Sequence, residues 1–479
     1  MDSGLIADIK KVAVPIVTAA EMRANDAYSI ANEPISSLDL LERASNALYN
    51  AFKKYISHQD PLHFIIGPGN NGGDGLCMAR LAMSDGFTVK ISTVFFDKPQ
   101  SKDNVFQCRL IQTFAPNMLK PLAGGDLLQL APNEIVVDCV FGTGLNSAVM
   151  GEYLKLIHKI NGSGNTVFSI DIPSGLLTDN VQADAPNVQA KKTITVQAPK
   201  PSFFYAENKI DFEIVNAGIQ TKNIAGNHFF LSPQDPYKSK LMATLPTKDP
   251  FGHKGSFGHA LIVGGNKGMY GAVAMAAKSC IAAGAGLTTV LAPLGANMYL
   301  SQIPQAMHIE KPLNKDTLDS VNLKKFSVLA IGPGLGTNAE SADFLKAALM
   351  QWNQPVILDA DALNILAIHD YLWEYVKPGS LLTPHPTEYK RLFGNFNTGV
   401  DLIQKSLAIA NEKQVFILAK NKYSMFFTPK GDVFHNGSGS AALAQGGSGD
   451  TLTGAIAGLA ARTHDLGFAG IYGAYLAGF

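Results

Sequence analysis

The stretch Ala444-Gln445-Gly446-Gly447-Ser448-Gly449-Asp450-Thr451-Leu452-Thr453-Gly454 leads directly into an apolar segment of small residues. Glycine fills three of four consecutive positions, so we expect a tight turn that exposes backbone N–H groups. From Thr451 the spacing indicates a helix, and a helix N-terminus attracts anions. Asp450 is unexpected there, because a carboxylate repels phosphate. It either takes a proton from a substrate hydroxyl beside a transferred phosphoryl group, or it only caps the helix.

The composition predicts two or three α/β domains in this chain of 479 residues. Lys and Arg together number 39, as do Asp and Glu, so no basic excess points to a nucleic-acid partner. The four cysteines are widely spaced and form no C-x-x-C motif, which argues against a zinc site or a disulfide framework. We therefore expect buried thiols in a reducing, cytoplasmic setting.

Neither the N-terminus nor the longest apolar segment predicts a membrane association. Residues 1–4 lack the basic and apolar regions of a signal peptide. The segment Gly271 to Ala292 is long enough to raise the question of a membrane span, but it contains Lys278 and is dominated by Ala and Gly. A packed helix followed by a strand over 287–291 is the better prediction.

The first half begins with a helical pattern over residues 16–56, with Thr18 as its cap. A strand over 62–66 then ends in the loop Gly67-Pro68-Gly69-Asn70-Asn71-Gly72-Gly73-Asp74-Gly75, and helical spacing follows. Strand, glycine turn and helix open a dinucleotide-type βαβ unit. The amide and carboxylate oxygens of the loop suit a hard cation or sugar hydroxyls, although a polar turn without a ligand has the same composition.

Two further strands of the first half end in the same way. Residues 135–138 end in Asp138 and lead to Gly142-Thr143-Gly144-Leu145-Asn146, and residues 167–171 end in Asp171 and lead to Pro173-Ser174-Gly175. Another strand is expected over 191–196. Because ligands bind at the carboxyl ends of strands in an open parallel sheet, these polar ends predict one shared site. A single Asp at a strand end would more often be a cap.

The strand pattern lapses between Gly218 and Pro246, where we place an interdomain linker over 220–240. In the second half, a strand leads to Asp359-Ala360-Asp361-Ala362-Leu363-Asn364, whose carboxylates either hold Mg²⁺ through water or cap the next helix. His385 lies between two prolines that fix it rigidly, so it is a ligand candidate or a structural residue. The absence of G-x-x-x-x-G-K-[ST] excludes a P-loop enzyme.

The motifs GPGNNGGDG (67–75), VDCVFGTGLN (137–146), SIDIPSGL (169–176) and APKP (198–201) resemble the NAD(P)H-hydrate epimerase domain over residues 15–219. The resemblance implies a Rossmann-like, three-layer domain that interconverts the R and S epimers of NADHX and NADPHX, which are reduced nicotinamide cofactors hydrated at C6. It implies Asp171 as the proton-transfer residue and a K⁺ ion held by Asn71, Asp138 and Ser174. The implied substrate contacts are Asn70, Asn71, Gly72, Gly73, Asp74, Gly142, Thr143, Gly144, Leu145, Asn146, Ser147, Ala148 and Asp171.

The motifs HKG (253–255), GPGLG (332–336), DADALN (359–364), LTPHPTE (382–388) and GGSGD (446–450) resemble the ADP/ATP-dependent NAD(P)H-hydrate dehydratase, of ribokinase-like α/β fold, over residues 240–479. The resemblance implies that the S epimer is dehydrated to NADH or NADPH with Mg²⁺ and ADP, or alternatively ATP. Asp450 is then the catalytic residue, and the hydrate contacts Ala272, Gly334, His385 and Asp450. The implied nucleotide contacts are Lys420, Asn421, Lys422, Tyr423, Ser424 and Gly449.

These patterns predict an epimerase domain over 1–219 and a dehydratase domain over 241–479, in a homo-oligomer without nucleic-acid or membrane partners. Asn421 departs from the glycine that is usual in the family after the lysine. Two alternatives stay open at this point. The second half could be a ribokinase-type small-molecule kinase joined to a Rossmann-like regulatory domain. The first half could also bind a ligand without catalysis.

Overall fold

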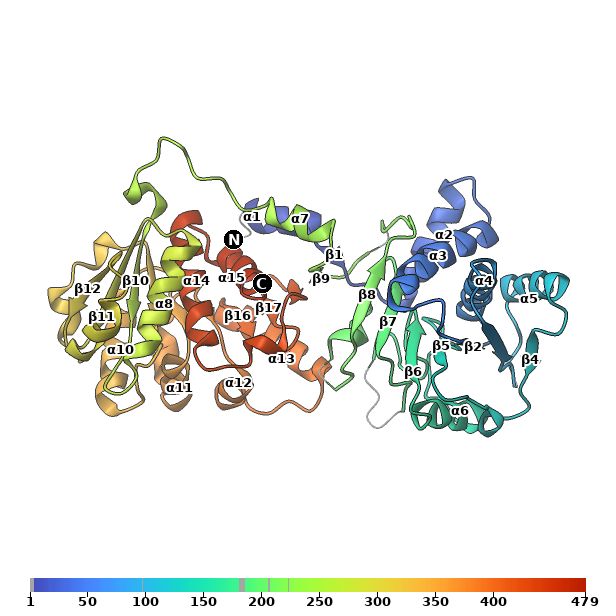
Figure 1. Cartoon of the computed structure of the whole chain (residues 1–479). Helices are drawn as coiled ribbons and strands as arrows, with labels where there is room; N and C mark the ends of the chain where they lie inside the picture. Colours follow the sequence, from blue (N-terminus) through green and yellow to red (C-terminus); the bar gives the residue numbers. More distant parts are fainter. Residues whose placement is uncertain (1–3, 97, 181–185, 206, 223) are drawn as a thin grey trace. The chain divides into compact units, whose positions relative to one another are not determined.

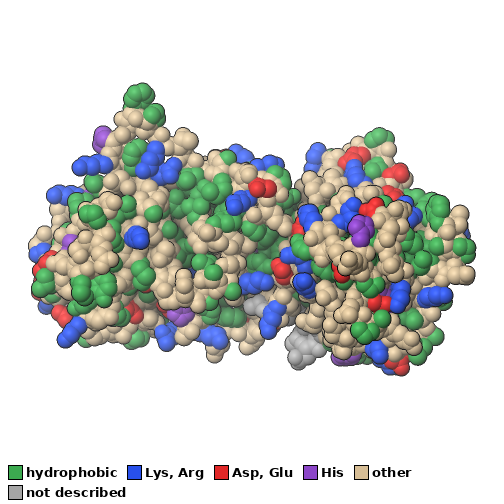
Figure 2. Space-filling view, viewed as in Figure 1, with side chains coloured by type: hydrophobic (Ala, Val, Ile, Leu, Met, Phe, Trp, Pro, Cys, Tyr) green, Lys and Arg blue, Asp and Glu red, His purple; other side chains and the backbone are tan. Residues whose placement is uncertain are grey.

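The computed structural model describes residues 4–96, 98–180, 186–205, 207–222 and 224–479. The chain divides into two compact units, which Figure 1 draws in sequence colours. We call Pro15–Gly226 with Thr398–Val400 the N-terminal unit. The C-terminal unit comprises Met1–Val14, Asn227–Asn397 and Asp401–Phe479. On the face seen in Figure 2, basic and acidic side chains are scattered among neutral ones on both units, in line with the balanced charge.

The N-terminal unit is built on a seven-stranded sheet in the order β4-β3-β2-β5-β6-β7-β8, with parallel pairing throughout. The strands are β2 (Leu62–Ile66), β3 (Val89–Thr93), β4 (Leu119–Pro121), β5 (Ile135–Cys139), β6 (Thr166–Ile170), β7 (Lys192–Val196) and β8 (Phe212–Val215). The helices are α2 (Ala19–Asn32), α3 (Ser37–Phe52), α4 (Asn70–Ser84), α5 (Lys102–Phe114) and α6 (Gly151–Asn161). This arrangement confirms the predicted parallel α/β sheet.

The helix predicted over 16–56 is two helices, α2 and α3, and this part of the prediction was wrong. Thr18 does cap α2, by accepting a hydrogen bond from the Glu21 N–H. The pattern breaks after Asn32 because Pro34 cannot continue a helix, and Ser36 then caps α3. The break matters for function because α2 and α3 both line the cavity described below.

The C-terminal unit is built on an eleven-stranded sheet in the order β1-β9-β18-β17-β16-β15-β14-β13-β10-β11-β12. Of its registered pairs, only those of β17 are antiparallel. The strands are β1 (Val14–Pro15), β9 (His228–Leu231), β10 (His259–Val263), β11 (Leu287–Ala292), β12 (Ala306–Glu310), β13 (Val328–Ile331), β14 (Ile357–Leu358), β15 (Leu381–Leu382), β16 (Phe416–Ala419), β17 (Met425–Phe427) and β18 (Val433–Asn436). The helices are α1 (Gly4–Val12), α7 (Tyr237–Met242), α8 (Tyr270–Ala283), α9 (Asn297–Leu300), α10 (Ala339–Gln351), α11 (Asp361–Ile368), α12 (Pro386–Phe393), α13 (Gly399–Lys413), α14 (Ser448–Thr463) and α15 (Leu466–Leu476).

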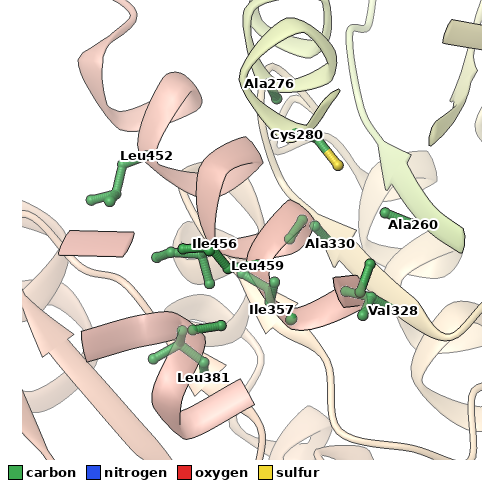
Figure 3. Close-up of a cluster of buried hydrophobic side chains, with 14 of the residues drawn as sticks. Ala260, Ala276, Cys280, Val328, Ala330, Ile357, Leu381, Leu452, Ile456 and Leu459 are labelled. Atoms are coloured by element: carbon green, nitrogen blue, oxygen red, sulfur yellow. The ribbon is translucent and has the colours of Figure 1, made fainter. Parts of the chain in front are cut away.

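The helix that follows the GGSGD loop, α14, is the centre of this unit. Figure 3 shows Ile456 and Leu459 projecting from it toward side chains of β13, β14 and β15, and Leu452 belongs to the same buried cluster. A Cβ atom on Gly454 would lie 1.9 Å from the Ala276 carbonyl oxygen, so α14 and α8 pack with backbones in close approach. This packing fixes the N-terminus of α14 at the edge of the sheet.

The N-terminal helix α1 belongs to the C-terminal unit, which differs from the predicted boundary at residue 1. Its apolar residues Ile6 and Ile9 are buried in the same core as α14 and α15. Lys10 forms an ion pair of 2.6 Å with Asp432 on the loop before β18. An i, i+3 apolar pair on a short helix does not reveal which core it joins. The units also meet in sequence at residues 226 and 227, within the predicted linker, and β9 and α7 are ordered elements that begin inside it.

The apolar segment 271–292 forms most of α8 and then β11, as predicted. Within the described part of the chain, no helix combines the length and the apolar character that a membrane crossing requires.

Candidate active sites

A cavity of about 540 Å³ lies in the N-terminal unit, where β2, β5, β6 and β7 end. The strand-end loops line one side of this cavity, and the helices α2 and α3 line the other. Of the predicted substrate contacts, those that line it are Asn70, Asn71, Asp74, Gly142, Thr143, Gly144, Leu145, Asn146 and Asp171. The loops thus meet at one place, as their position at a common sheet edge implied.

Four predicted contacts are not part of that lining: Gly72, Gly73, Ser147 and Ala148. The structure shows a packing role for the two glycines, and their contact with the substrate stays a prediction. A Cβ atom on Gly72 would lie 2.0 Å from the Gly67 carbonyl oxygen, and one on Gly73 would lie 2.9 Å from Leu41. They let the first turn of α4 pack tightly against the preceding loop and α3.

Asp171 enters the cavity on a strained backbone, with a φ of 65° directly after β6. Its Oδ1 accepts a hydrogen bond of 2.6 Å from Lys200 Nζ, and its side chain is 15% exposed. Lys200 is fully buried, and it also donates to Thr195 Oγ1 at 2.6 Å. Left-handed backbone and a buried cationic partner hold this carboxylate in one orientation, as expected for a proton-transfer group.

Two other carboxyl groups face the same cavity, Asp26 from α2 and Asp74 from α4. Burial raises the pKa of Asp26 to about 6, with a further increase from Asp171 and an opposing effect of Lys200. Burial also raises the pKa of Asp74 well above its usual value, although the Ser45 hydroxyl, which donates to Asp74 Oδ1 at 2.8 Å, acts against this. The sequence did not identify Asp26, because the sequence pattern of a helix does not distinguish an Asp that faces a cavity from an Asp that is exposed to solvent.

The three residues predicted to hold a cation are connected through the backbone of Phe141. Asn71 Nδ2 donates to the Phe141 carbonyl at 2.8 Å, and the Phe141 N–H donates to Ser174 Oγ at 2.9 Å. Ser174 Oγ in turn donates to Asp138 Oδ1 at 2.6 Å. Burial raises the pKa of Asp138, against the hydrogen bonds from Ser174, Ser169 and Val140.

Asn71 Oδ1 is buried and accepts no hydrogen bond from any residue that the structure describes. An orphan amide oxygen near a buried carboxylate and a hydroxyl offers the hard oxygen ligands that an alkali cation requires. The residues present therefore fit the predicted K⁺ ion.

The second site lies at the N-terminus of α14. Gly447 is the N-cap residue with a φ of 89°, and Asp450 is the third residue of the helix. The alternative in which Asp450 is only the N-cap is therefore wrong. Asp450 lines a cavity of about 470 Å³ together with Gly268, Met269, Gly271, Ala272, Tyr299, Gly334 and Asp361. The predicted contacts Ala272, Gly334 and Asp450 thus meet, whereas Tyr299 and Asp361 were not assigned to the hydrate site.

The carboxyl group of Asp450 accepts no hydrogen bond from the described residues, so it is available to a ligand. Burial raises its pKa to about 6, Asp359 and Asp361 add to the increase, and Lys420 opposes it. A carboxyl group with a pKa near neutrality, beside the orphan N–H groups of a helix, is suited to take a proton from a hydroxyl while those N–H groups stabilise an anion.

Lys420 does not project freely toward a nucleotide. Its Nζ lies 2.8 Å from Asp359 Oδ1, and Thr383 and Thr453 also donate to this buried carboxylate, at 2.7 and 2.6 Å. Although burial acts in the opposite direction, Lys420 and these hydroxyls lower the pKa of Asp359. Asp359 was expected either to hold Mg²⁺ through water or to cap the next helix. In the structure its carboxylate does neither, because it is buried beneath α14, where Lys420 neutralises its charge.

The other predicted nucleotide contacts form the turn between β16 and β17 and the start of α14. The Asn421 side chain accepts from the Lys422 N–H at 2.8 Å, and Ser424 Oγ donates to the Asn421 carbonyl at 3.1 Å. Tyr423 belongs to the same turn. A Cβ atom on Gly449 would lie 3.6 Å from Lys420 Nζ, which brings this turn next to the GGSGD loop.

His385, another predicted hydrate contact, caps a helix with its ring, and its contact with the hydrate stays a prediction. Its Nδ1 accepts from the Thr387 N–H at 3.1 Å, which caps α12, and its Nε2 lies 3.2 Å from Glu388 Oε1. Its side chain is 47% exposed, and it is not among the residues that line the cavity of Asp450. Burial and nearby Lys420 lower its pKa, so the ring is neutral near pH 7.

Comparison with known proteins assigns both units. Residues 260–479 match the family model described as NAD(P)H-hydrate dehydratase, and residues 37–202 match the one described as YjeF-related protein N-terminus. The bifunctional NAD(P)H-hydrate repair enzyme of Moorella thermoacetica is 33% identical over 97% of this chain and 91% of its own length. The enzyme of that name from Leishmania major is 31% identical over 94% of this chain and 85% of its own length.

Among solved structures, the ADP/ATP-dependent NAD(P)H-hydrate dehydratase of Bacillus subtilis, co-crystallised with ATP and Mg²⁺, is 28% identical. The superposition covers 50% of this chain and 86% of the Bacillus subtilis chain, with a TM-score of 0.44. The full-length relatives and the two domain matches agree with each other. The chain therefore belongs to the family of bifunctional NAD(P)H-hydrate repair enzymes.

Proposed function

We propose that this chain repairs hydrated nicotinamide cofactors in two steps, one in each unit. The N-terminal unit interconverts the R and S forms of NADHX and NADPHX, and the C-terminal unit dehydrates the S form to NADH or NADPH. The observation that carries the proposal is Asp450, a carboxyl group with a pKa of about 6 that lines a cavity at a glycine-rich helix N-terminus. A simple anion site would not place an acid there.

In the dehydration step, Asp450 takes the proton of the C6 hydroxyl group, and the hydroxyl oxygen accepts a phosphoryl group from the nucleotide. Phosphate then leaves with the electron pair of the C6–O bond, the ring nitrogen supplies its lone pair to C6, and loss of a C5 proton restores the dihydronicotinamide. The N–H groups of Gly447 and Gly449 stabilise the negative charge on the transferred group. Hydroxide alone is a poor leaving group, which is why a nucleotide is consumed.

The nucleotide is proposed to be ADP, with ATP as the alternative, bound with Mg²⁺ between the turn Lys420 to Ser424 and Gly449. The closeness of Gly449 to Lys420 supports this position. Because Asp359 already neutralises Lys420, we assign the phosphate contacts chiefly to backbone N–H groups of α14. Asp361 faces the cavity and is the better of the two DADALN carboxylates for Mg²⁺.

In the epimerisation step, Asp171 transfers the proton and the loop Gly142 to Asn146 holds the ring. A K⁺ ion bound by Asn71, Asp138 and Ser174 would balance the buried charge of Asp138 and hold the strand-end loops together. The orphan oxygen of Asn71 supports this assignment. Arg23 and Lys98 line the same cavity and supply positive charge for the phosphates of the dinucleotide.

The test supplies the purified chain with a mixture of both NADHX epimers and Mg²⁺, and follows the return of dihydronicotinamide absorbance. ADP, ATP or neither is added, each in K⁺ and in Na⁺ buffer. Full recovery of both epimers with one nucleotide supports both assignments and identifies the phosphoryl donor. Accumulation of a stable phosphorylated product would instead favour the kinase alternative.

A further inference from the structure

The carboxyl group of Asp26 lines the N-terminal cavity but has no role in the mechanism proposed above. It projects from the middle of α2 into the cavity that Asp171 enters from the end of β6. Within the described part of the chain, no group donates a hydrogen bond to it. A partly buried carboxyl group without a protein partner, facing a cavity, is suited to interact with a ligand.

The chemistry of epimerisation requires two proton-transfer groups rather than one. The hydrate carries its hydroxyl on C6, beside the ring nitrogen, and inversion must break a bond at C6 and re-form it on the other face. Breaking the C6–O bond requires an acid that protonates the leaving oxygen, and re-forming it requires a base that takes a proton from the incoming water. Asp171 accepts the hydrogen bond of Lys200 and so enters the cavity as a carboxylate acceptor. The acid must come from elsewhere.

We propose that Asp26 is the second catalytic residue of the epimerase site and forms an acid–base pair with Asp171. This inference rests on the proposed epimerase activity. The Asp26 carboxyl donates its proton to the C6 hydroxyl oxygen, and water leaves with the C6–O electron pair while the nitrogen lone pair forms a C6=N1 double bond. Water then adds to the other face of C6, Asp171 takes its proton, and the electron pair of the double bond returns to nitrogen.

After one turnover Asp26 is ionised and Asp171 is protonated, which is the state required to convert the product epimer back. Both directions therefore use the same pair with exchanged roles, and proton exchange with solvent in the cavity restores the starting state. This symmetry suits an enzyme that must work on both epimers.

The electrostatics of the cavity agree with this division of roles. The other charged groups that line this cavity come from several elements and are Arg23 on α2, Asp74 on α4, Lys98 before α5 and Asp171 after β6; the buried Lys200 after β7 also acts on the pKa of Asp26. Burial and the Asp171 carboxylate raise the pKa of Asp26 to about 6, so a protonated fraction is present near neutral pH. Asp74 already accepts a hydrogen bond from Ser45, which makes it less available for proton transfer.

The test measures conversion of the purified R epimer to the S epimer without nucleotide, by chromatography, in Asp26→Asn. We expect kcat to fall by about 10²–10⁴-fold, as is typical for loss of a general acid, with little change in KM. Asp26→Glu should recover part of the rate. The matched control is Asp211→Asn, which removes an exposed carboxylate of the same unit that pairs with Lys192. We expect the wild-type rate to fall at high pH as Asp26 loses its proton, and this fall should be absent from the residual activity of Asp26→Asn.

Dehydration of the purified S epimer by the same variant provides an internal check. A normal dehydration rate with lost epimerisation supports the proposal. Wild-type epimerisation rate and pH profile in Asp26→Asn would overturn it and leave the epimerase function intact. If the wild-type chain itself does not epimerise, the proposed function fails instead, and the two failures are distinguished.

Discussion

Each unit places a lysine–aspartate ion pair at the carboxyl ends of parallel strands, but the two pairs differ in which residue lines the cavity. In the N-terminal unit the paired residue, Asp171, itself lines the cavity, 2.6 Å from Lys200. In the C-terminal unit the paired residue, Asp359, is buried, 2.8 Å from Lys420, and its neighbour Asp450 lines the cavity without a hydrogen bond from the described residues.

We interpret the difference as one motif serving two purposes. Lys200 orients the carboxylate that we propose acts on the substrate, whereas Lys420 neutralises a carboxylate beneath the helix N-terminus. Because Lys420 is already paired, the pKa of Asp450 is set mainly by burial, which raises it. The first arrangement favours a fixed proton acceptor, and the second favours a base whose affinity for protons matches neutral pH.

The largest effect is expected from Asp450→Asn, which removes the base but leaves the helix N-terminus intact. Dehydration of the S epimer should fall by about 10²–10⁴-fold, because the hydroxyl proton has no acceptor. Epimerisation of the same sample should be unchanged. Retention of the wild-type dehydration rate would show that Asp450 is only a helix residue.

Lys420→Met tests the buried pair and should act on stability more than on chemistry. Loss of one partner of a buried ion pair costs about 3–5 kcal/mol, measured by denaturant unfolding. The native pKa of Asp359 is lowered, so its contribution to stability is full above its unfolded pKa and is lost as the pH falls through the native value. The variant should lack this loss at acid pH.

Lys200→Met is the matched change in the other unit, and it distinguishes the two pairs. If the comparison is correct, this variant loses epimerisation as well as stability, whereas Lys420→Met keeps dehydration as long as the chain is folded. Equal effects on both activities would remove the distinction between the pairs.

A smaller effect concerns the pH dependence of dehydration. Asp450 acts as a base only when ionised, and its pKa is about 6, so kcat/KM should fall toward a tenfold loss per pH unit below that value. Asp361 contributes to raising this pKa, so Asp361→Asn should move the acid limb to lower pH. If the acid limb of the kcat/KM profile does not move in this variant, the group that titrates is not Asp450.

The smallest effect is expected from Asn421→Gly, which restores the residue usual in the family. The change removes the acceptor for the Lys422 N–H but leaves the turn exposed, so the free energy of unfolding should change by no more than about 0.5 kcal/mol. The KM for the nucleotide, measured at saturating S epimer, then shows whether the turn contacts the nucleotide.

Much of the fold and the loops of both sites could be predicted because a glycine turn directly after an apolar strand is compatible with few local structures. The positions of Asp171, Asp450 and the loop Gly142 to Asn146 follow from this rule and from the shared edge of parallel strands. The tight approach of α14 to α8, through Gly454, could not be read from the same pattern.

The features that were missed depend on contacts between distant segments. Asp26 lies on a helix that would look solvated, and Lys200 reaches back from the loop after β7 to a strand end 29 residues earlier. Helix α1 joins the C-terminal core although it is the first element of the chain. The capping of α12 by the His385 ring was also not anticipated, and its contact with the hydrate stays a prediction. Sequence spacing does not contain this information.

The central claim is that two independent sites on one chain act in succession, and mixing two inactivated chains tests it most directly. Asp171→Asn and Asp450→Asn are each supplied with both NADHX epimers, Mg²⁺ and nucleotide, and then combined. We predict that Asp171→Asn recovers the S fraction, and the R fraction only as fast as it epimerises without a catalyst. Asp450→Asn should recover almost no dihydronicotinamide, and the mixture should recover both epimers fully. A mixture that recovers no more than Asp171→Asn alone would contradict the account.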